Sequence, residues 1–316
     1  MTQAPAPPQN LRMGALDWGL LLLLSILWGG TFFFGKIAVR EISPFTIVLA
    51  RVGIAAAILA VVVVASGAGF PKGIKAWAPF FVMGLVNNVI PFSLIFWGQQ
   101  EIGAGFASVL NAATPLSGAV MAHLLTDDEK LRSNRLIGVL LGMAGVAVLV
   151  GPSGLRMNWG PMLGAVAVLA STFSYGFAGV WGRRFRAVPA LTSSCCQLTC
   201  SSLIMVPVVI FVDRPWLRGW PGSQAIMAVL VIAVLATAFA YVIFFTILRR
   251  AGGSNVMLVT LLVPFSATGL SITFLGEQVR ATDLAGAALV GLALIIIDGR
   301  AYAALRGMAA GPSAAG

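Results

Sequence analysis

The sequence is poor in charge. Asp, Glu, Lys and Arg make up 9% of its 316 residues, whereas a soluble domain carries roughly 25%. Carboxylates are half as numerous as basic residues, with ten Asp and Glu against twenty Lys and Arg, and there is a single His. Hydrophobic residues account for 59% of the chain, and the mean hydropathy is +0.96. This composition excludes a soluble globular domain.

Other features are missing as well. The net charge of +10 comes from basic residues scattered between apolar runs, so the chain lacks the basic face of a nucleic-acid-binding protein. Its apolar runs are too long and continuous for an outer-membrane barrel, whose strands alternate polar and apolar residues. No HExxH or GxSxG motif accompanies the single His123, which argues against an integral-membrane enzyme. No ring of polar residues indicates a channel.

Three cysteines, Cys195, Cys196 and Cys200, fall within one apolar run with no histidine or carboxylate nearby. Buried thiols of this kind behave as small hydrophobic side chains. The sequence therefore predicts neither a metal site nor a cofactor.

Long apolar runs dominate the remaining sequence. A helix needs about 20 apolar residues to cross the hydrocarbon core of a bilayer. The runs predict an all-α integral membrane protein with ten transmembrane helices, near residues 16–35, 45–65, 77–98, 105–125, 135–151, 159–181, 188–212, 223–247, 253–276 and 282–299. Residues 1–14 and 301–316 are expected to form disordered tails. Lys and Arg favour one set of alternate loops by about two to one, which predicts that both termini are cytoplasmic.

The two halves of the chain align with each other. Trp18 aligns with Trp159, Thr31 with Thr172, and Pro115 with Pro264. Glu129 and Glu277 also correspond, so residues 15–151 and 156–300 form two repeats of five predicted spans each. Because five is odd, the second repeat must be inverted in the membrane. Inverted repeats are typical of secondary transporters, whose substrate site lies near the midplane between the repeats.

Several segments resemble the EamA-type carriers of the drug/metabolite transporter superfamily. Residues 27–36 (LWGGTFFFGK) are similar to the family's first-span motif, with Pro44 and Arg51 spaced as in the family. Residues 104–129 and 252–277 each resemble its run of small residues, mid-span proline and trailing glutamate. Residues 237–241 and 248–251 resemble its eighth span and exit.

The resemblance implies a ten-helix transporter in a bacterial inner membrane, most similar to exporters of amino acids and other metabolites. Its partners would be membrane lipid and a small-molecule substrate, with no nucleic acid, and the protein would be a monomer or a weak homodimer.

Two prolines suggest where the pathway runs. A proline inside a helix releases the carbonyl four residues earlier, so Pro115 would free Asn111 and Pro264 would free Thr260. Broken helices of this kind form midplane sites in transporters. The alternative is that the kinks only shape helix packing.

Further pathway candidates lie in the third and eighth predicted spans. Asn87 and Asn88 precede Phe92, and the repeat alignment places Tyr241 opposite Phe92. Two adjacent amides in hydrocarbon need hydrogen-bond partners, so they either bond to a neighbouring helix or line a cavity. The candidate aromatic walls are Trp28, Tyr175 and Phe265.

Charged residues within the spans limit the classes of substrate that we expect. Arg51 lies about two turns inside its span, where it would snorkel outward, pair with backbone carbonyls or Glu41, or gate the substrate. Because phosphate binding needs several well-placed cations, we expect a neutral or zwitterionic substrate. Amino acids are the first candidates, with drug-like or nucleoside-like compounds as the alternative.

The remaining charges are expected near helix ends. Glu129 and Glu277 would cap helices or pair with basic residues there, and His123 lies near the end of its span. Proton-driven pumps relay protons through ionisable groups inside the bilayer. We therefore expect transport without proton coupling.

Overall fold

The computed structural model describes residues 13–127, 133–155, 159–185 and 187–298. Throughout these residues every regular element is a helix and there is no strand. Glu129, most of the predicted N-terminal tail and the predicted C-terminal tail lie outside the described residues.

The first half of the chain forms a series of helices interrupted by one π-helix. Their bounds are α1 Ala15–Ala38, α2 Pro44–Ala65, η1 Ile74–Ala76, α3 Ala78–Gly84, η2 Leu85–Val89, α4 Ile90–Glu101, α5 Ala104–Asn111, α6 Thr114–Leu125 and α7 Ser133–Leu155. The π-helix η2 joins α3 to α4 without a break in the helical path.

The second half is also a series of helices, with the π-helices η4 and η6 among them. Its elements are α8 Trp159–Gly182, η3 Arg183–Phe185, α9 Ala190–Val208, η4 Val209–Asp213, η5 Pro215–Leu217, α10 Ser223–Ala233, η6 Val234–Phe239, α11 Ala240–Ala251, α12 Gly253–Val256, α13 Val259–Leu275 and α14 Ala281–Asp298. The π-helix η6 joins α10 to α11 as η2 joins α3 to α4.

Seven helical stretches of the described chain are long and apolar enough to cross a membrane. They are Ala15–Ala38, Pro44–Ala65, Ile74–Glu101, Ala104–Leu125, Trp159–Phe185, Ala190–Leu217 and Ser223–Ala251. Three shorter apolar helices, Leu136–Val148, Val259–Leu275 and Ala281–Ala293, accompany them. The fold is that of a multi-pass helical membrane protein, and each predicted span falls on a helical stretch.

The two prolines do not produce equivalent breaks. Pro115 lies in the first turn of α6, directly after the turn that separates α5 from α6, because a proline at a helix start needs no backbone donor. Pro264 instead lies inside α13, and the chain breaks earlier, between α12 and α13. Each half has a break in this span, but the break before α13 lies at Met257 and Leu258, so the expectation that Pro264 marks a break matching that at Pro115 is wrong.

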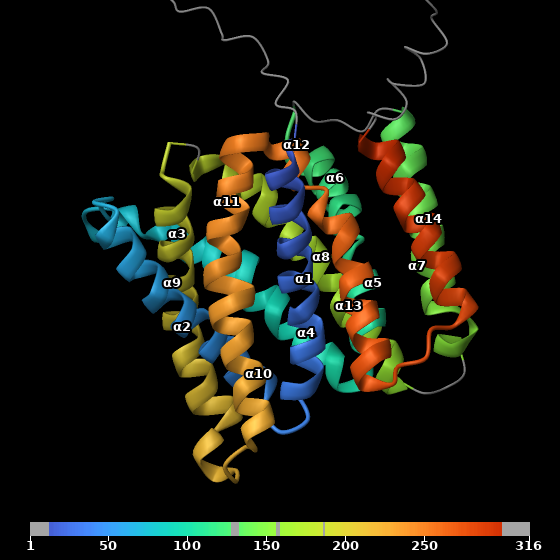
Figure 1. Ribbon diagram of the computed structural model, residues 1–316, viewed down its shortest axis with the longest axis horizontal. Coiled ribbons are helices and arrows are strands. Elements are labelled where there is room, and N and C mark those ends of the chain that lie inside the picture. Colours follow the sequence, from blue (N-terminus) through green and yellow to red (C-terminus); the bar gives the residue numbers. More distant parts are fainter. Residues whose placement is uncertain (1–12, 128–132, 156–158, 186, 299–316) are drawn as a thin grey trace, which may run out of the picture.

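Several helix contacts have a counterpart when each helix is replaced by the helix at the same place in the other half. Helix α1 packs against α13 and against α10 and α11, while α8 packs against α6 and α4. Helix α2 packs on α9, and α7 pairs with α14 at one side of the bundle (Figure 1). The start of α1 and the end of α14 lie at the same end of the bundle (Figure 1).

Two close helix contacts correspond to each other in this pattern. In the α1–α13 seam, the hydroxyls of Ser25 and Ser266 are 2.7 Å apart, and a Cβ on Gly29 would lie 2.7 Å from the Ser266 Cβ. In the α8–α6 seam, the hydroxyls of Thr172 and Ser117 are 2.6 Å apart, and a Cβ on Gly176 would lie 2.9 Å from the Ser117 carbonyl oxygen.

In each seam, the first helix carries a hydroxyl residue followed four residues later by glycine. This spacing places both residues on one face of the helix. Glycine in each seam lets the two backbones approach closely, as small residues do in membrane helices.

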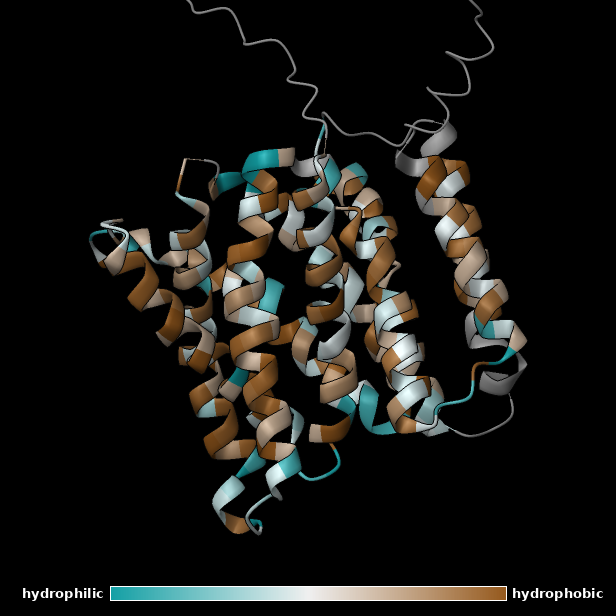
Figure 2. Cartoon of the chain, in the orientation of Figure 1, coloured by the Kyte–Doolittle hydropathy of each residue, from teal (hydrophilic) through white to brown (hydrophobic). Residues whose placement is uncertain are grey.

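Hydrophobic residues cover the length of the helices, and hydrophilic residues gather toward both ends of the bundle (Figure 2). Large apolar side chains such as Phe211 and Leu140 are exposed on the outside of the bundle. Gly138 and Gly142 form a GxxxG pair in α7, and Gly142 faces Leu116 of α6, so this contact is internal to the chain. The surface is suited to lipid rather than to water.

Candidate transport pathway

Arg51 lies at the centre of the candidate site. It occupies the eighth position of α2, yet its side chain reaches residues in the middle of two other spans. Its Nε donates a hydrogen bond of 2.9 Å to the Thr237 hydroxyl of η6, and its guanidinium carbon lies 3.7 Å from the ring centroid of Phe92 in α4. The residue is only 7% exposed. Arg51 therefore points into the bundle rather than snorkelling toward Glu41.

The π-helix η6 prepares Thr237 to accept this bond. The Thr237 hydroxyl donates its proton to the carbonyl of Ile232, five residues earlier, over 2.8 Å. The hydroxyl oxygen then has a lone pair left for Arg51. π-Helical turns often occur at functional sites, because the extra residue reorients side chains. Here the turn fixes one edge of the guanidinium.

Two tyrosines complete the surroundings of Arg51. Tyr175 of α8 and Tyr241 of α11 both lie within electrostatic range of its guanidinium. Tyr175 packs on both large apolar clusters of the bundle, whereas Tyr241 packs on one and stacks on Phe245 with ring centroids 6.0 Å apart. We call Arg51, Phe92, Thr237, Tyr175 and Tyr241 the central cluster.

A cavity of about 300 Å³ reaches the central cluster at Tyr175. It lies between α6 and α8, and Met257 contributes from the turn after α12. Pro115 and Thr114 line its wall at the start of α6. The predicted pathway residues Pro115 and Tyr175 therefore border one cavity.

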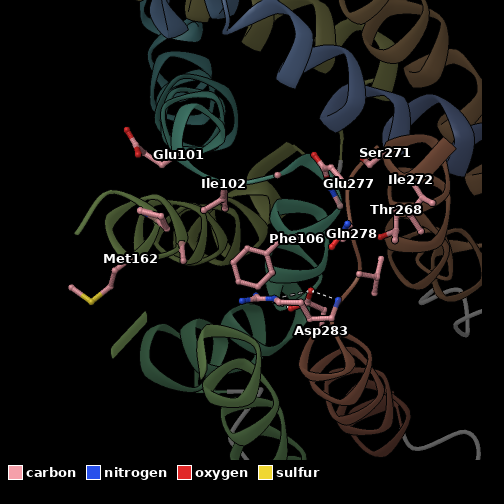
Figure 3. A pocket seen from close by; sticks show the side chains of 16 residues that line it. Glu101, Ile102, Phe106, Met162, Thr268, Ser271, Ile272, Glu277, Gln278 and Asp283 are labelled. Carbon is pink, nitrogen blue, oxygen red and sulfur yellow. Dashed lines mark hydrogen bonds and ion pairs between the residues drawn. The ribbon is translucent and has the colours of Figure 1, made fainter. Parts of the chain in front are cut away.

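A second pocket of about 290 Å³ lies where α5, α13 and the start of α14 meet (Figure 3). Glu277 accepts hydrogen bonds from the backbone N–H groups of Ala104, over 2.7 Å, and Gly105, over 3.1 Å. Its carboxylate thus caps the N-terminus of α5, where the helix dipole favours negative charge.

Asp283 in the same pocket accepts from Arg280, so much of the pocket's charge is already paired. Phe106 forms part of the pocket wall near this pair (Figure 3).

The two asparagines of η2 bond to α9. Asn87 Nδ2 donates to Gln197 Oε1 and Asn88 Nδ2 donates to Ser201 Oγ, both over 3.0 Å. Asn88 is completely buried, and its Oδ1 has no partner. Of the two alternatives for these amides, the structure shows interhelical bonding.

The predicted residues around the helix breaks do not share one cavity. The Asn111 backbone carbonyl accepts from the Thr114 hydroxyl, while the Asn111 Oδ1 is buried without a partner. The Thr260 hydroxyl donates to the Met257 carbonyl at the start of α13. Local hydroxyls therefore satisfy carbonyls near the breaks.

The remaining aromatic candidates divide between inside and outside. Trp28 of α1 packs on Phe244 of α11, with ring centroids 5.6 Å apart. Phe265 is 78% exposed and so forms no interior wall in this conformation. It lies on an exposed face of α13, which sequence spacing alone did not reveal.

Charged side chains near the helix ends form contacts between the two halves of the chain. Arg250 of α11 pairs with Asp17 of α1 over 2.7 Å, and Asp213 accepts two hydrogen bonds from Thr46 at the start of α2. His123 lies in the last turn of α6, as expected. The three cysteines of α9 are buried and carry no disulfide.

Sequence reasoning missed Thr237 as a site residue, although it is a hydroxyl in the middle of an apolar span. It also missed Gln99, which is fully buried and donates to the Phe32 carbonyl over 2.7 Å. Lys36 donates to the Gln99 carbonyl over 2.6 Å, which ties α1 to α4. The presence of polar residues within apolar spans was the available signal.

Comparison with known proteins connects this arrangement to a family. The sequence profile of the EamA-like transporter family matches residues 18–151 and again residues 162–298. The same profile therefore covers both halves of the chain.

Individual relatives cover nearly the whole chain. The uncharacterized transporter YoaV of Bacillus subtilis is 21% identical over 271 residues, which are 85% of this chain and 92% of YoaV. Protein PecM of Dickeya dadantii is 23% identical over 86% of this chain and 89% of its own, and the uncharacterized inner membrane transporter YedA of Escherichia coli is 20% identical over 89% and 90%.

A solved crystal structure has the same fold, with a TM-score of 0.61 and 19% identity over 90% of this chain and 98% of that one.

Proposed function

Because the chain belongs to the EamA-like transporter family, and is thus a membrane transporter of the drug/metabolite type rather than an enzyme, we propose that it moves small zwitterionic or neutral metabolites by alternating access. One observation carries the proposal. The central cluster draws its side chains from α2 and α4 of the first half and from η6, α8 and α11 of the second. A substrate held there would contact both halves.

We further propose ten spans arranged as two inverted repeats. Support comes from the family profile, which matches each half separately, and from helix contacts that recur when the halves are exchanged. The π-helices η2 and η6 also occupy corresponding spans, and α1 begins at the end of the bundle where α14 finishes. An even number of spans returns the chain to its starting side. We place the protein in a bacterial inner membrane with cytoplasmic termini.

Amino acids are the leading substrates in this proposal, and export is the proposed direction. Arg51 provides a single cation, whereas phosphorylated metabolites need several donors around each phosphate. The alternative substrates are drug-like or nucleoside-like compounds, which the aromatic side chains of the cluster would favour.

Counterflow in proteoliposomes tests the proposal. Vesicles containing the purified transporter and loaded with one unlabelled amino acid should take up the same labelled amino acid faster than empty vesicles. A panel of amino acids, nucleosides and sugar phosphates ranks the substrates. A clear preference for sugar phosphates would contradict the substrate class, and the absence of counterflow with every compound would contradict the transporter.

Coupling is tested in the same vesicles. We expect an imposed pH gradient to leave the final substrate level unchanged, because the described carboxylates lie at helix ends or connections and His123 lies in the last turn of α6. The variant His123→Ala should exchange substrate at nearly the wild-type rate. Accumulation above equilibrium in response to a pH gradient would contradict uncoupled transport.

A further inference from the structure

We infer that Arg51 binds a carboxylate of the transported substrate, which restricts the substrates to small molecules that carry a carboxylate. The inference rests on the proposed transport function and narrows it. Neutral nucleosides and uncharged drug-like compounds fall outside the class, although they are compatible with the transporter fold.

Arg51 carries a buried positive charge that no carboxylate of the described residues balances. Its side chain is almost completely buried, and none of the described carboxylates forms an ion pair with it. Burying an unpaired charge is expensive, and proteins normally pair or coordinate such groups. Near the helix ends of this chain, Arg250 and Arg280 both have carboxylate partners even though each is about half exposed. The most buried arginine of the three is the one without a counterion.

The guanidinium of Arg51 is also held in a defined orientation. Nε is held by Thr237, and Phe92 lies against the guanidinium. No described residue accepts a hydrogen bond from the two terminal nitrogens. A guanidinium presents its N–H groups in a planar fork that matches the two oxygens of a carboxylate. The cluster thus orients Arg51 while leaving its terminal donors for a ligand.

Two tyrosines near Arg51 add further hydrogen-bond donors. Tyr175 and Tyr241 place two hydroxyls in the electrostatic field of the guanidinium, and each can donate a hydrogen bond to an anion there. Tyr175 also lines the cavity between α6 and α8, through which a ligand would reach the cluster. A carboxylate on Arg51 would therefore lie in a region that also holds two phenol donors, from α8 and α11.

The number of donors favours a carboxylate over a phosphate. One guanidinium and two phenols can satisfy a singly charged planar group. A phosphate monoester carries about two charges and three strongly accepting oxygens, whereas Arg51 is the one cation among the five residues of the central cluster. The remaining walls, Phe92 and the tyrosine rings, suit an apolar side chain attached to the carboxylate.

The first experiment changes the ligand and leaves the protein intact. Counterflow of a labelled amino acid is competed with the unlabelled acid, its primary amide and its N-acetyl derivative. The amide loses the carboxylate, and the N-acetyl compound keeps it but loses the ammonium group. We expect the amide to compete at least about tenfold more weakly than the acid, because charge-assisted bonds to a guanidinium are lost. The N-acetyl compound should keep most of the acid's potency.

The second experiment changes the protein. Arg51→Gln should remove the difference between acid and amide, and Arg51→Lys should retain only part of it because lysine lacks the planar fork. Arg40→Gln removes an exposed cation near the end of α1 and serves as the control that keeps the full difference. If Arg51→Gln does not fold, Arg51→Lys and the wild-type ligand series decide.

The outcomes separate the inference from the proposed function. Equal competition by acid and amide, or a difference that persists in Arg51→Gln, overturns carboxylate binding while transport remains. Counterflow of nucleosides or neutral drug-like compounds alone likewise overturns the inference and leaves the transporter intact. Absence of counterflow with every compound overturns the proposed function and the inference with it.

Discussion

The α1–α13 seam and the α8–α6 seam each contain a hydrogen bond between two hydroxyls, but the bonded residues occupy different positions along α1 and α8. Ser117 and Ser266 occupy matching places beside the repeat prolines, and each bonds to a hydroxyl on the first helix of the other half. The repeat alignment pairs Thr172 with Thr31, but Ser266 bonds to Ser25, six residues before Thr31. At 1.5 Å per residue this is a displacement of about 9 Å along the helix.

The displacement leaves one hydroxyl of α1 without a hydrogen-bond partner in this conformation. Thr172 bonds to Ser117, whereas the Oγ1 of Thr31 is buried with no partner. The two halves thus hold different contacts. If they are the inverted repeats proposed above, an exchange of these contacts would accompany alternating access. The asymmetry includes the residues themselves, because the repeat alignment places Val166 of α8, which has no hydroxyl, opposite Ser25 of α1.

The largest expected effect comes from adding a methyl group to the α1–α13 seam. In Gly29→Ala the new Cβ would lie 2.7 Å from the Ser266 Cβ and 2.8 Å from the Ala267 backbone nitrogen, so the helices must move apart. We expect a loss of about 2 to 3 kcal/mol in thermal unfolding of the detergent-purified protein, as for overpacked cores.

Control variants calibrate this loss. Gly19→Ala in the same helix meets nothing within 4 Å, and it should leave stability unchanged or raise it. Gly176→Ala in the α8–α6 seam should cost less than Gly29→Ala, because one of its near contacts is the flexible side chain of Met121. Equal stability of Gly29→Ala and Gly19→Ala would show that the α1–α13 seam is looser than described.

A smaller effect is expected from removing the hydroxyl bond of the α8–α6 seam. Thr172→Val keeps the shape of the side chain but leaves Ser117 without its partner on α8. Interhelical bonds in membranes contribute about 0.6 kcal/mol on average, so the melting temperature should fall slightly. A double-mutant cycle with Ser117→Ala measures the coupling, and a coupling energy of zero would contradict the bond.

The smallest effect, with the opposite sign, is expected at Thr31. Thr31→Val removes a buried hydroxyl that has no partner, so stability should stay constant or rise by up to about 1 kcal/mol. If the halves exchange arrangements during transport, the same variant should slow counterflow despite its stability. A destabilised Thr31→Val would mean that this hydroxyl is bonded in the resting conformation.

The sequence predicted the class of structure better than the partners of individual residues. Hydropathy and length locate apolar helices because these are local properties of the chain. Arg51 lies about two turns inside its span, as expected, but its position along α2 does not reveal that its side chain extends to α4 and η6. The need of Asn87 for a partner was predictable, but its partner Gln197 is 110 residues away.

The helix breaks show the same limit. Pro115 and Pro264 align in sequence, yet only Pro115 lies at a helix start, because the break in the second half falls at Met257 and Leu258, several residues before its proline. A capping role was among the alternatives for Glu277, but that it caps α5 follows only from the three-dimensional arrangement.

The cap made by Glu277 has a consequence for biosynthesis. Ala104 and Gly105 are made 173 and 172 residues before the carboxylate that satisfies their N–H groups. A ribosome adding about 5 to 20 residues per second needs roughly 10 to 30 seconds to cover that distance. During that interval the first turn of α5 must rely on water or lipid headgroups, so the N-terminal half acquires its final form only after the C-terminal half has been inserted.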